Sequence, residues 1–128
     1  MTLTGNWSYP TNIRFGAGRI SEIADACTTA GIKKPLLVTD RGLVDMDITQ
    51  RTLDLLDTAG LGRAMFSEVD PNPNDKNAEE GVRFYREGGY DGVVAFGGGS
   101  GLDIGKVIAF MAGPVSYTHL TLPTTPYV

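Results

Sequence analysis

The sequence has little of what a secreted or membrane-spanning protein needs. It contains a single cysteine, Cys27, among 128 residues, which excludes an internal disulfide and indicates a reducing compartment. Apolar residues at helical spacing around Cys27 indicate core packing and not a reactive thiol. No apolar run approaches the roughly 20 residues that cross a bilayer, and the N-terminus lacks the charged-then-apolar layout of a secretory signal. We therefore expect a cytoplasmic protein with no membrane partner.

Basic side chains and histidine are also scarce. The chain has 11 Lys and Arg against 15 Asp and Glu, a formal net charge of −4 at pH 7. This balance offers no basic patch, so we expect no nucleic-acid partner. The only histidine is His119, and no His, Cys and acidic residues cluster at the spacing of metal ligands. The sequence therefore predicts no metal site in this chain.

Short apolar segments do alternate with segments of helical periodicity. We expect strands near residues 13–15, 35–39, 64–66 and 93–96, and helices over 19–30, 48–59, 74–88 and from 101 onward. The inward side chains of the second helix are predicted to be Ile48, Leu55, Leu56 and Ala59. This alternation predicts one α/β domain with a parallel sheet flanked by helices. In open sheets of this kind, ligands bind at the carboxyl ends of the strands.

One of these carboxyl ends carries the sequence Gly-Gly-Gly-Ser, residues 97–100. Three glycines allow a sharp turn and a close approach of the backbone to a ligand. We expect Ser100 to be the N-cap of the following helix, with Asp103 completing a capping box. Backbone N–H groups at such a helix start suit a phosphate group. Neither a Walker A loop nor the G-x-G-x-x-G fingerprint is complete here, so a glycine turn without a ligand remains an alternative.

Two further polar residues follow predicted strands. Asp40 ends the strand at 35–39, where a carboxylate can accept hydrogen bonds from both ribose hydroxyls and repel a 2′-phosphate. A helix cap or a solvated loop is the alternative. Asn72 lies between two prolines after the third strand, where a rigid turn is the alternative. Lys106 is expected to be a surface residue. The candidate cofactor-binding residues are therefore Asp40, Asn72, Gly97, Gly98, Gly99, Ser100 and Asp103.

The last 14 residues do not follow the pattern of the rest. After a helix break at Gly113-Pro114, residues 115–128 contain no Asp, Glu, Lys or Arg but four threonines and two prolines. We predict that this segment is a non-native tail that leaves the sheet unfinished, and that residues 1–114 are a partial dinucleotide-binding domain. A natural disordered tail is the alternative. Genomic DNA across codons 113–118 distinguishes the two.

Four motifs in order along the chain carry a family resemblance. They are Ile13-Arg-Phe-Gly-x-Gly18, Leu37-Val-Thr-Asp40, Pro71-Asn-Pro73 and, most specifically, the GGGS-x-x-D-x-x-K pattern from Gly97 to Lys106. With these motifs, residues 1–114 resemble the N-terminal domain of the iron-containing (group III) alcohol dehydrogenases. The resemblance implies a Rossmann-like fold that binds NAD(P), with the glycine loop on the pyrophosphate. It also implies that Asp40 favours NAD over NADP and that Asn72 and Asp103 lie close to the cofactor.

The resemblance further implies hydride transfer between an alcohol or aldehyde and the nicotinamide, assisted by Fe²⁺ or sometimes Zn²⁺. In that family one Asp and three His in a helical C-terminal domain hold the metal, and the enzymes form homo-oligomers. This chain has no such set of ligands, so no catalytic or metal-ligating residue can be assigned in it. We expect a fragment of a dehydrogenase that retains half of the cofactor site and is inactive alone.

Three other interpretations remain open. The chain could derive from the related glycerol dehydrogenase and dehydroquinate synthase branch, although Ser100 with Asp103 favours the alcohol dehydrogenases. It could be a non-catalytic α/β module, either a small nucleotide-binding module or a flavodoxin-like receiver, although Asp40 stands alone after Thr39 where a receiver has an acidic pair. It could also fail to fold, because apolar surface meant for a missing domain would be exposed.

Overall fold

The computed structural model describes residues 4–8, 12–70, 74–112 and 116–121. Side chains are described for residues 17–70 and 74–112. In chain order its elements are β1 (Thr4–Ser8), β2 (Asn12–Gly16), the 3-10 helix η1 (Arg19–Glu22), α1 (Ile23–Thr29), β3 (Pro35–Val38), α2 (Asp47–Thr58), β4 (Met65–Phe66), α3 (Asp75–Gly88), β5 (Gly92–Gly97), α4 (Gly99–Met111) and β6 (Ser116–Thr121).

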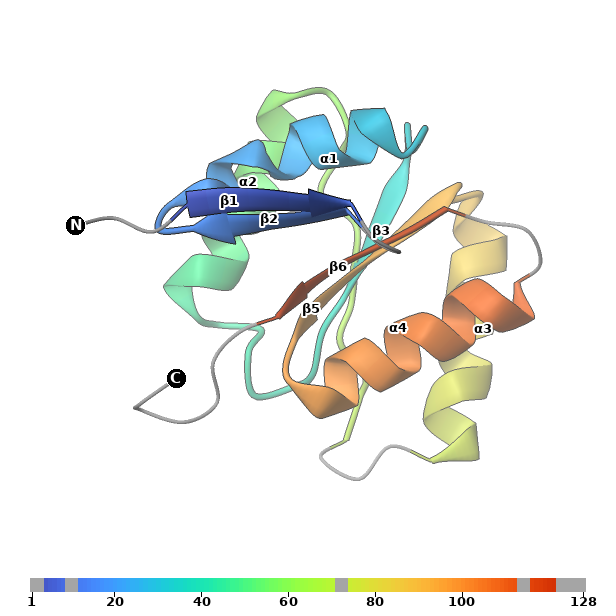
Figure 1. Ribbon diagram of the computed structural model, residues 1–128. Helices are drawn as coiled ribbons and strands as arrows, with labels where there is room; N and C mark the ends of the chain where they lie inside the picture. The colour runs from blue at the N-terminus through green and yellow to red at the C-terminus, as the bar shows by residue number, and fades with distance from the viewer. Residues whose placement is uncertain (1–3, 9–11, 71–73, 113–115, 122–128) are drawn as a thin grey trace.

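A parallel sheet forms the centre of the described part of the chain. Its strand order is β4-β3-β5-β6, and β1 and β2 form a separate antiparallel pair. Every residue of β3 and β5 is buried, because helices cover both faces of the sheet: α1 and α2 lie on one side and α3 and α4 on the other (Figure 1). This burial explains why both strands are continuous apolar runs instead of alternating ones. The predicted α/β class is confirmed.

Alternate residues of the central strands enter two separate cores. Leu36, Val38 and Val93 pack with side chains of α3 and α4, such as Val82 and Ile108. Leu37, Val94 and Phe96 pack on the other face with α1 and α2. The second core includes Cys27, whose side chain is fully buried. Burial, with a smaller contribution from Asp91, raises the pKa of the Cys27 thiol to about 11. The prediction that Cys27 is a core residue is confirmed.

The strand order creates a switch point between β3 and β5. From β3 the chain passes through α2 to β4 on one side, and then through α3 to β5 on the opposite side of β3. The loops that leave β3 and β5 at their carboxyl ends therefore diverge toward opposite faces. In open α/β sheets, the crevice between two such loops is where ligands bind.

The inward face of α2 differs from the prediction. Leu56 is buried as expected, but Ile48 and Leu55 are only partly buried and Ala59 is exposed. The remaining fully inward positions include two threonines. Their hydroxyls donate hydrogen bonds to backbone carbonyls, Thr49 to Leu43 at 2.6 Å and Thr52 to Ile48 at 2.8 Å. A hydroxyl with such a partner can be buried at low cost. The prediction was wrong because it assigned only apolar residues to the buried face of α2.

The structure contains one strand after residue 114 that the sequence did not predict. Residues 116–121 form β6, which pairs in parallel with β5 in the register Gly92↔Ser116 to Gly97↔Thr121. Threonine and tyrosine favour strands, and the open edge of β5 offers unpaired backbone groups to any adjacent extended segment. The non-native origin of residues 115–128 stays a prediction, because a strand can form there whatever its origin.

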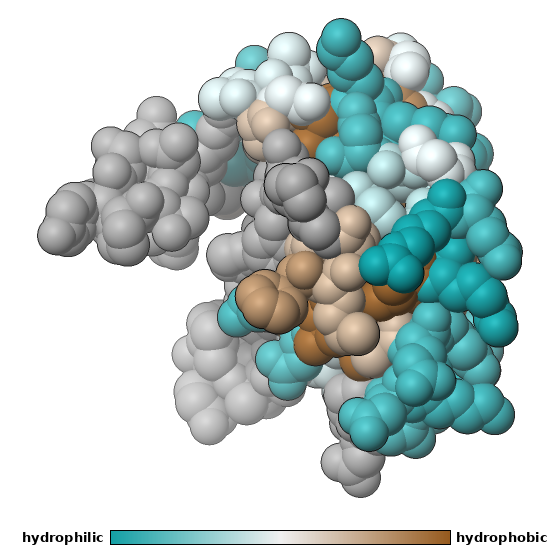
Figure 2. Space-filling view, turned by 90° about the vertical axis from the view of Figure 1, so that its right-hand side faces the viewer, coloured by the Kyte–Doolittle hydropathy of each residue, from teal (hydrophilic) through white to brown (hydrophobic). Residues whose placement is uncertain are grey.

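Helix α4 is the most apolar helix and is only partly covered. Ile104 and Ile108 are buried against α3 and the sheet, whereas Phe110 and Met111 at its end are exposed by 87% and 51%. Figure 2 shows an apolar patch among hydrophilic residues on the side of the molecule that carries α3 and α4. None of the described helices is long and apolar enough to cross a membrane.

Candidate functional site

The carboxyl ends of β3 and β5 bring Asp40 and the glycine loop together. The two strands pair in parallel, with Val38 opposite Ala95, so the residues that follow them are neighbours. A Cβ built on Gly97 would lie 3.9 Å from Oδ2 of Asp40. Asp40 and Gly97, which the sequence places after separate strands, therefore lie side by side. Asn72, the third candidate, lies outside the described residues.

The turn after β5 requires glycine at its first position. Gly97 has φ +120°, a conformation that other residues rarely adopt, and a Cβ there would lie 2.5 Å from Cδ1 of Leu43. Gly98 has an extended backbone, and α4 begins at Gly99. A Cβ built on Gly99 would meet only open space. The loop is therefore closely packed beneath Gly97 and open beside Gly99.

The start of α4 differs from the prediction. Gly98 is the N-cap and Gly99 is already helical, so Ser100 is the second residue of the helix and not its cap. No side chain caps this helix, and Asp103 is exposed in its second turn. The predicted capping box is therefore wrong, because Gly99 joins the helix. Because the N-cap is a glycine, it has no side chain that could accept a hydrogen bond from the N–H groups of the first turn.

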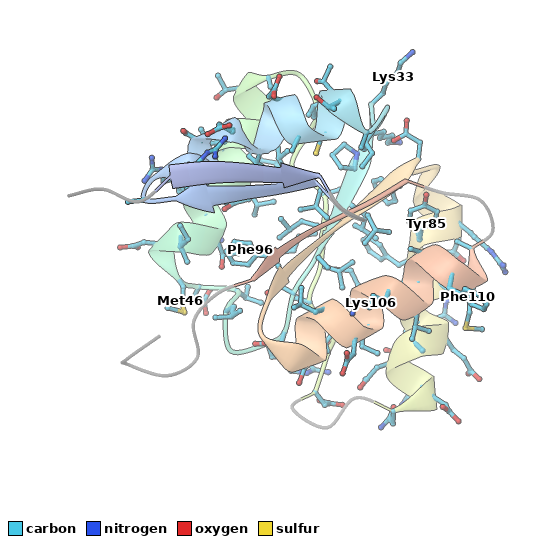
Figure 3. The ribbon with its side chains drawn as sticks, viewed as in Figure 1. Lys33, Met46, Tyr85, Phe96, Lys106 and Phe110 are labelled. Atoms are coloured by element: carbon cyan, nitrogen blue, oxygen red, sulfur yellow. The ribbon has the colours of Figure 1, made fainter. Side chains whose placement is uncertain are left out.

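Thr39 and Gly101 hold the start of α4 against the strand ends, and sequence analysis missed both. The buried Thr39 hydroxyl donates a 2.9 Å hydrogen bond to the carbonyl oxygen of Phe96, which Figure 3 labels. A Cβ on Gly101 would lie 2.8 Å from that same oxygen and 3.4 Å from Cα of Thr39. A fourth glycine one residue after the Gly-Gly-Gly-Ser sequence was the signal that could have revealed this close approach.

The two carboxylate oxygens of Asp40 have different surroundings. Oδ1 accepts a 2.9 Å hydrogen bond from the backbone N–H of Gly42, which forms a local turn within the loop. Oδ2 is the one of the two that would lie 3.9 Å from a Cβ on Gly97. The side chain can therefore shape its own loop and still present an acceptor to the crevice. Lys106 is exposed on α4, as predicted (Figure 3).

The described residues do not fit a metal ion. They contain no group of three or more His, Cys, Asp or Glu side chains that could hold one. An iron centre needs such a group of oxygen and nitrogen ligands. The described part of the chain thus offers no metal centre.

The fold defines an α/β protein of the Rossmann-like type, and the comparisons with known proteins specify it further. Residues 10–126 match the model of the family described as iron-containing alcohol dehydrogenase. The chain belongs to this family.

Two curated relatives illustrate the similarity. The chain is 41% identical over 104 residues to 4-hydroxybutyrate dehydrogenase from Cupriavidus necator, a match that covers 81% of this chain and 27% of the relative. It is also 41% identical over 100 residues to 1,3-propanediol dehydrogenase from Klebsiella pneumoniae, covering 77% and 26%. The chain spans about a quarter of the length of these relatives.

Solved structures agree with this assignment. A 1,3-propanediol oxidoreductase superposes with a TM-score of 0.74 at 39% identity, covering 81% of this chain and 27% of that one. A sulfoacetaldehyde reductase from Bifidobacterium kashiwanohense, solved in complex with NAD⁺, superposes with a TM-score of 0.70 at 30% identity and covers 87% and 33%. The fold of this chain therefore corresponds to one portion of a longer family structure.

The contact between Gly101 and the strand ends predicts the effect of a methyl group there. Gly101→Ala should lower the free energy of unfolding by about 1–3 kcal/mol, because the added Cβ meets backbone atoms that cannot move aside easily. Gly99→Ala is the matched control; it has open space and should leave stability unchanged or raise it by up to about 1 kcal/mol. Urea denaturation measures both, and equal stabilities would contradict the packing described.

Proposed function

We propose that this chain is the N-terminal, cofactor-binding part of an iron-dependent alcohol dehydrogenase. The whole enzyme would transfer a hydride between an alcohol or aldehyde and NAD. The observation that carries the proposal is the position of Asp40 beside Gly97 at the switch point of the sheet. Family membership and the dehydrogenase and reductase names of the relatives support it.

The residues at the sheet edge fit a dinucleotide. In our proposal the loop from Gly97 to Ser100 holds the pyrophosphate, since an uncapped helix start attracts phosphate and the space beside Gly99 is open. Oδ2 of Asp40 would accept hydrogen bonds from the adenosine ribose. Asn72 and Asp103 would lie close to the cofactor. The bound NAD would supply the carbon that accepts or donates the hydride.

The catalytic part of the site would come from outside this chain. The described residues do not fit Fe²⁺, so we assign them neither a metal ligand nor a catalytic residue. The parent enzyme would be cytoplasmic and homo-oligomeric, act on a small alcohol or aldehyde, and need no nucleic acid or membrane. Residues 1–114 would form the partial dinucleotide-binding domain within it.

The charge of Asp40 predicts the choice between the two nicotinamide cofactors. Asp40→Gly should raise the affinity for NADP⁺ relative to NAD⁺ by roughly tenfold, because it removes the repulsion of the 2′-phosphate and the acceptor for the ribose hydroxyls. NMR titration of the chain with each nucleotide measures the ratio even for weak binding. Glu87→Gln is the matched control. It removes an equal charge near the C-terminal end of α3 and should leave the ratio unchanged. An unchanged ratio in Asp40→Gly would show that Asp40 does not read the ribose.

The absence of a fitting metal site among the described residues predicts no turnover. The chain supplied with Fe²⁺, NAD⁺ and an alcohol such as 1,3-propanediol should form no NADH above the rate without protein. A full-length relative, the 1,3-propanediol dehydrogenase of Klebsiella pneumoniae, serves as the positive control under the same conditions. Protein-dependent NADH formation by this chain would overturn the proposal that the catalytic part lies elsewhere.

A further inference from the structure

The side chains of Asp40 and Arg41 leave the end of β3 in opposite directions. Asp40 approaches Gly97 on the β5 side, whereas the Arg41 guanidinium lies over the residues that follow β4. There it forms two ion pairs, Nη1 with Oε2 of Glu68 at 2.7 Å and Nε with Oδ1 of Asp70 at 3.1 Å. Two consecutive residues thus place a carboxylate on the β5 side of β3, toward the crevice, and an ion-paired cation on its β4 side.

Hydrogen bonds from neighbouring residues fix the position of Arg41 and of its partner Asp70. Its backbone N–H donates a 3.3 Å hydrogen bond to the carbonyl oxygen of Val69. Asp70 in turn accepts a 3.2 Å hydrogen bond from Nδ2 of Asn77, which is only 4% exposed. Asn77 is itself held by the reciprocal capping box with Asn74 at the start of α3. The acceptor of Arg41 is therefore anchored to a helix and not only to a loop.

An arginine near the ribose carboxylate has a known chemical consequence in sheets of this kind. A free guanidinium there can accommodate the 2′-phosphate that distinguishes NADP from NAD, because its planar array of donors matches phosphate oxygens. In this chain, two of the donor nitrogens of Arg41 already face carboxylates. A phosphate approaching Arg41 would also meet the negative charges of Glu68 and Asp70.

We propose that Glu68 and Asp70 determine nucleotide specificity by holding Arg41 away from the ribose. Asp40 would disfavour a 2′-phosphorylated nucleotide by repulsion, and Glu68 and Asp70 would strengthen this preference. This inference rests on the proposed function, because it concerns the same nucleotide. The three side chains are about half exposed, and ion pairs at such positions contribute little to stability. Their removal should therefore change specificity more than folding.

The double variant Glu68→Gln/Asp70→Asn tests the proposal. It keeps the shapes of both side chains and removes their charges, so Arg41 is released. NADP⁺ should bind roughly tenfold more tightly, the order expected of hydrogen bonds from a charged donor to phosphate, while NAD⁺ affinity should stay within about twofold. NMR titration of the 128-residue chain with each nucleotide measures both affinities, and thermal unfolding checks that the fold is kept.

Two further variants separate the role of Arg41 from a general effect of charge. Asp54→Asn removes the closer of the two ion pairs of Arg63, a residue that precedes β4, and should leave the nucleotide ratio unchanged. The triple variant Glu68→Gln/Asp70→Asn/Arg41→Ala should lose the gain in NADP⁺ affinity. A gain that persists without Arg41 would overturn the proposal, because repulsion alone would then explain it.

The remaining outcomes distinguish this inference from the function on which it rests. If the original chain binds NAD⁺ and the double variant shows no gain for NADP⁺, the role of Glu68 and Asp70 is wrong and the nucleotide site stands. If neither the original chain nor any variant binds either nucleotide, the proposed function of this chain is wrong and the specificity role is wrong with it.

Discussion

The parallel pairing of β3 with β5 is the constraint on which the rest of the structure depends. The two strands are separated in the chain by α2, β4 and α3, yet they are direct neighbours in the sheet. Their pairing aligns their carboxyl ends, and the helices on both faces of the sheet bury both strands completely. The hydrogen bond from Thr39 to Phe96 joins those ends, so the glycine turn and the aspartate loop leave the sheet from one place. Without this pairing, the two loops would not lie next to each other.

Much of the local structure could be predicted because local rules decide it. The buried strand at 35–39 was visible as an apolar run, and the helix at 75–88 was visible between an Asn that can cap and a Gly that can end it. Gly89 does adopt the left-handed conformation at that end. The start of α4 could not be predicted in the same way. Gly98 and Ser100 are both acceptable as an N-cap, and the cap falls at Gly98, where Gly101 packs closely on the strand ends.

The sequence could predict only those candidate-site residues that directly follow a strand. Asp40 and the glycine loop each stand directly after a strand, so the strand pattern alone placed them at the correct edge. The ion pairs of Arg41 with Glu68 and Asp70 could not be found. The strand that precedes the two acids was predicted, but its place beside β3 is a long-range outcome. The partners of Arg41 come from that neighbour, and no spacing in the sequence indicates them. Residues that shape the site through other strands required the structure.

The central claim is that the edge between β3 and β5 holds the adenosine and pyrophosphate of NAD. Backbone amide NMR of the chain titrated with ADP-ribose tests it most directly, because this molecule carries those groups without the nicotinamide. The account predicts chemical-shift changes concentrated at Asp40 and at residues 97–101. Changes confined to the groove between α3 and the end of α4, lined by residues such as Glu79, Arg83 and Met111, or no changes at all, would contradict it.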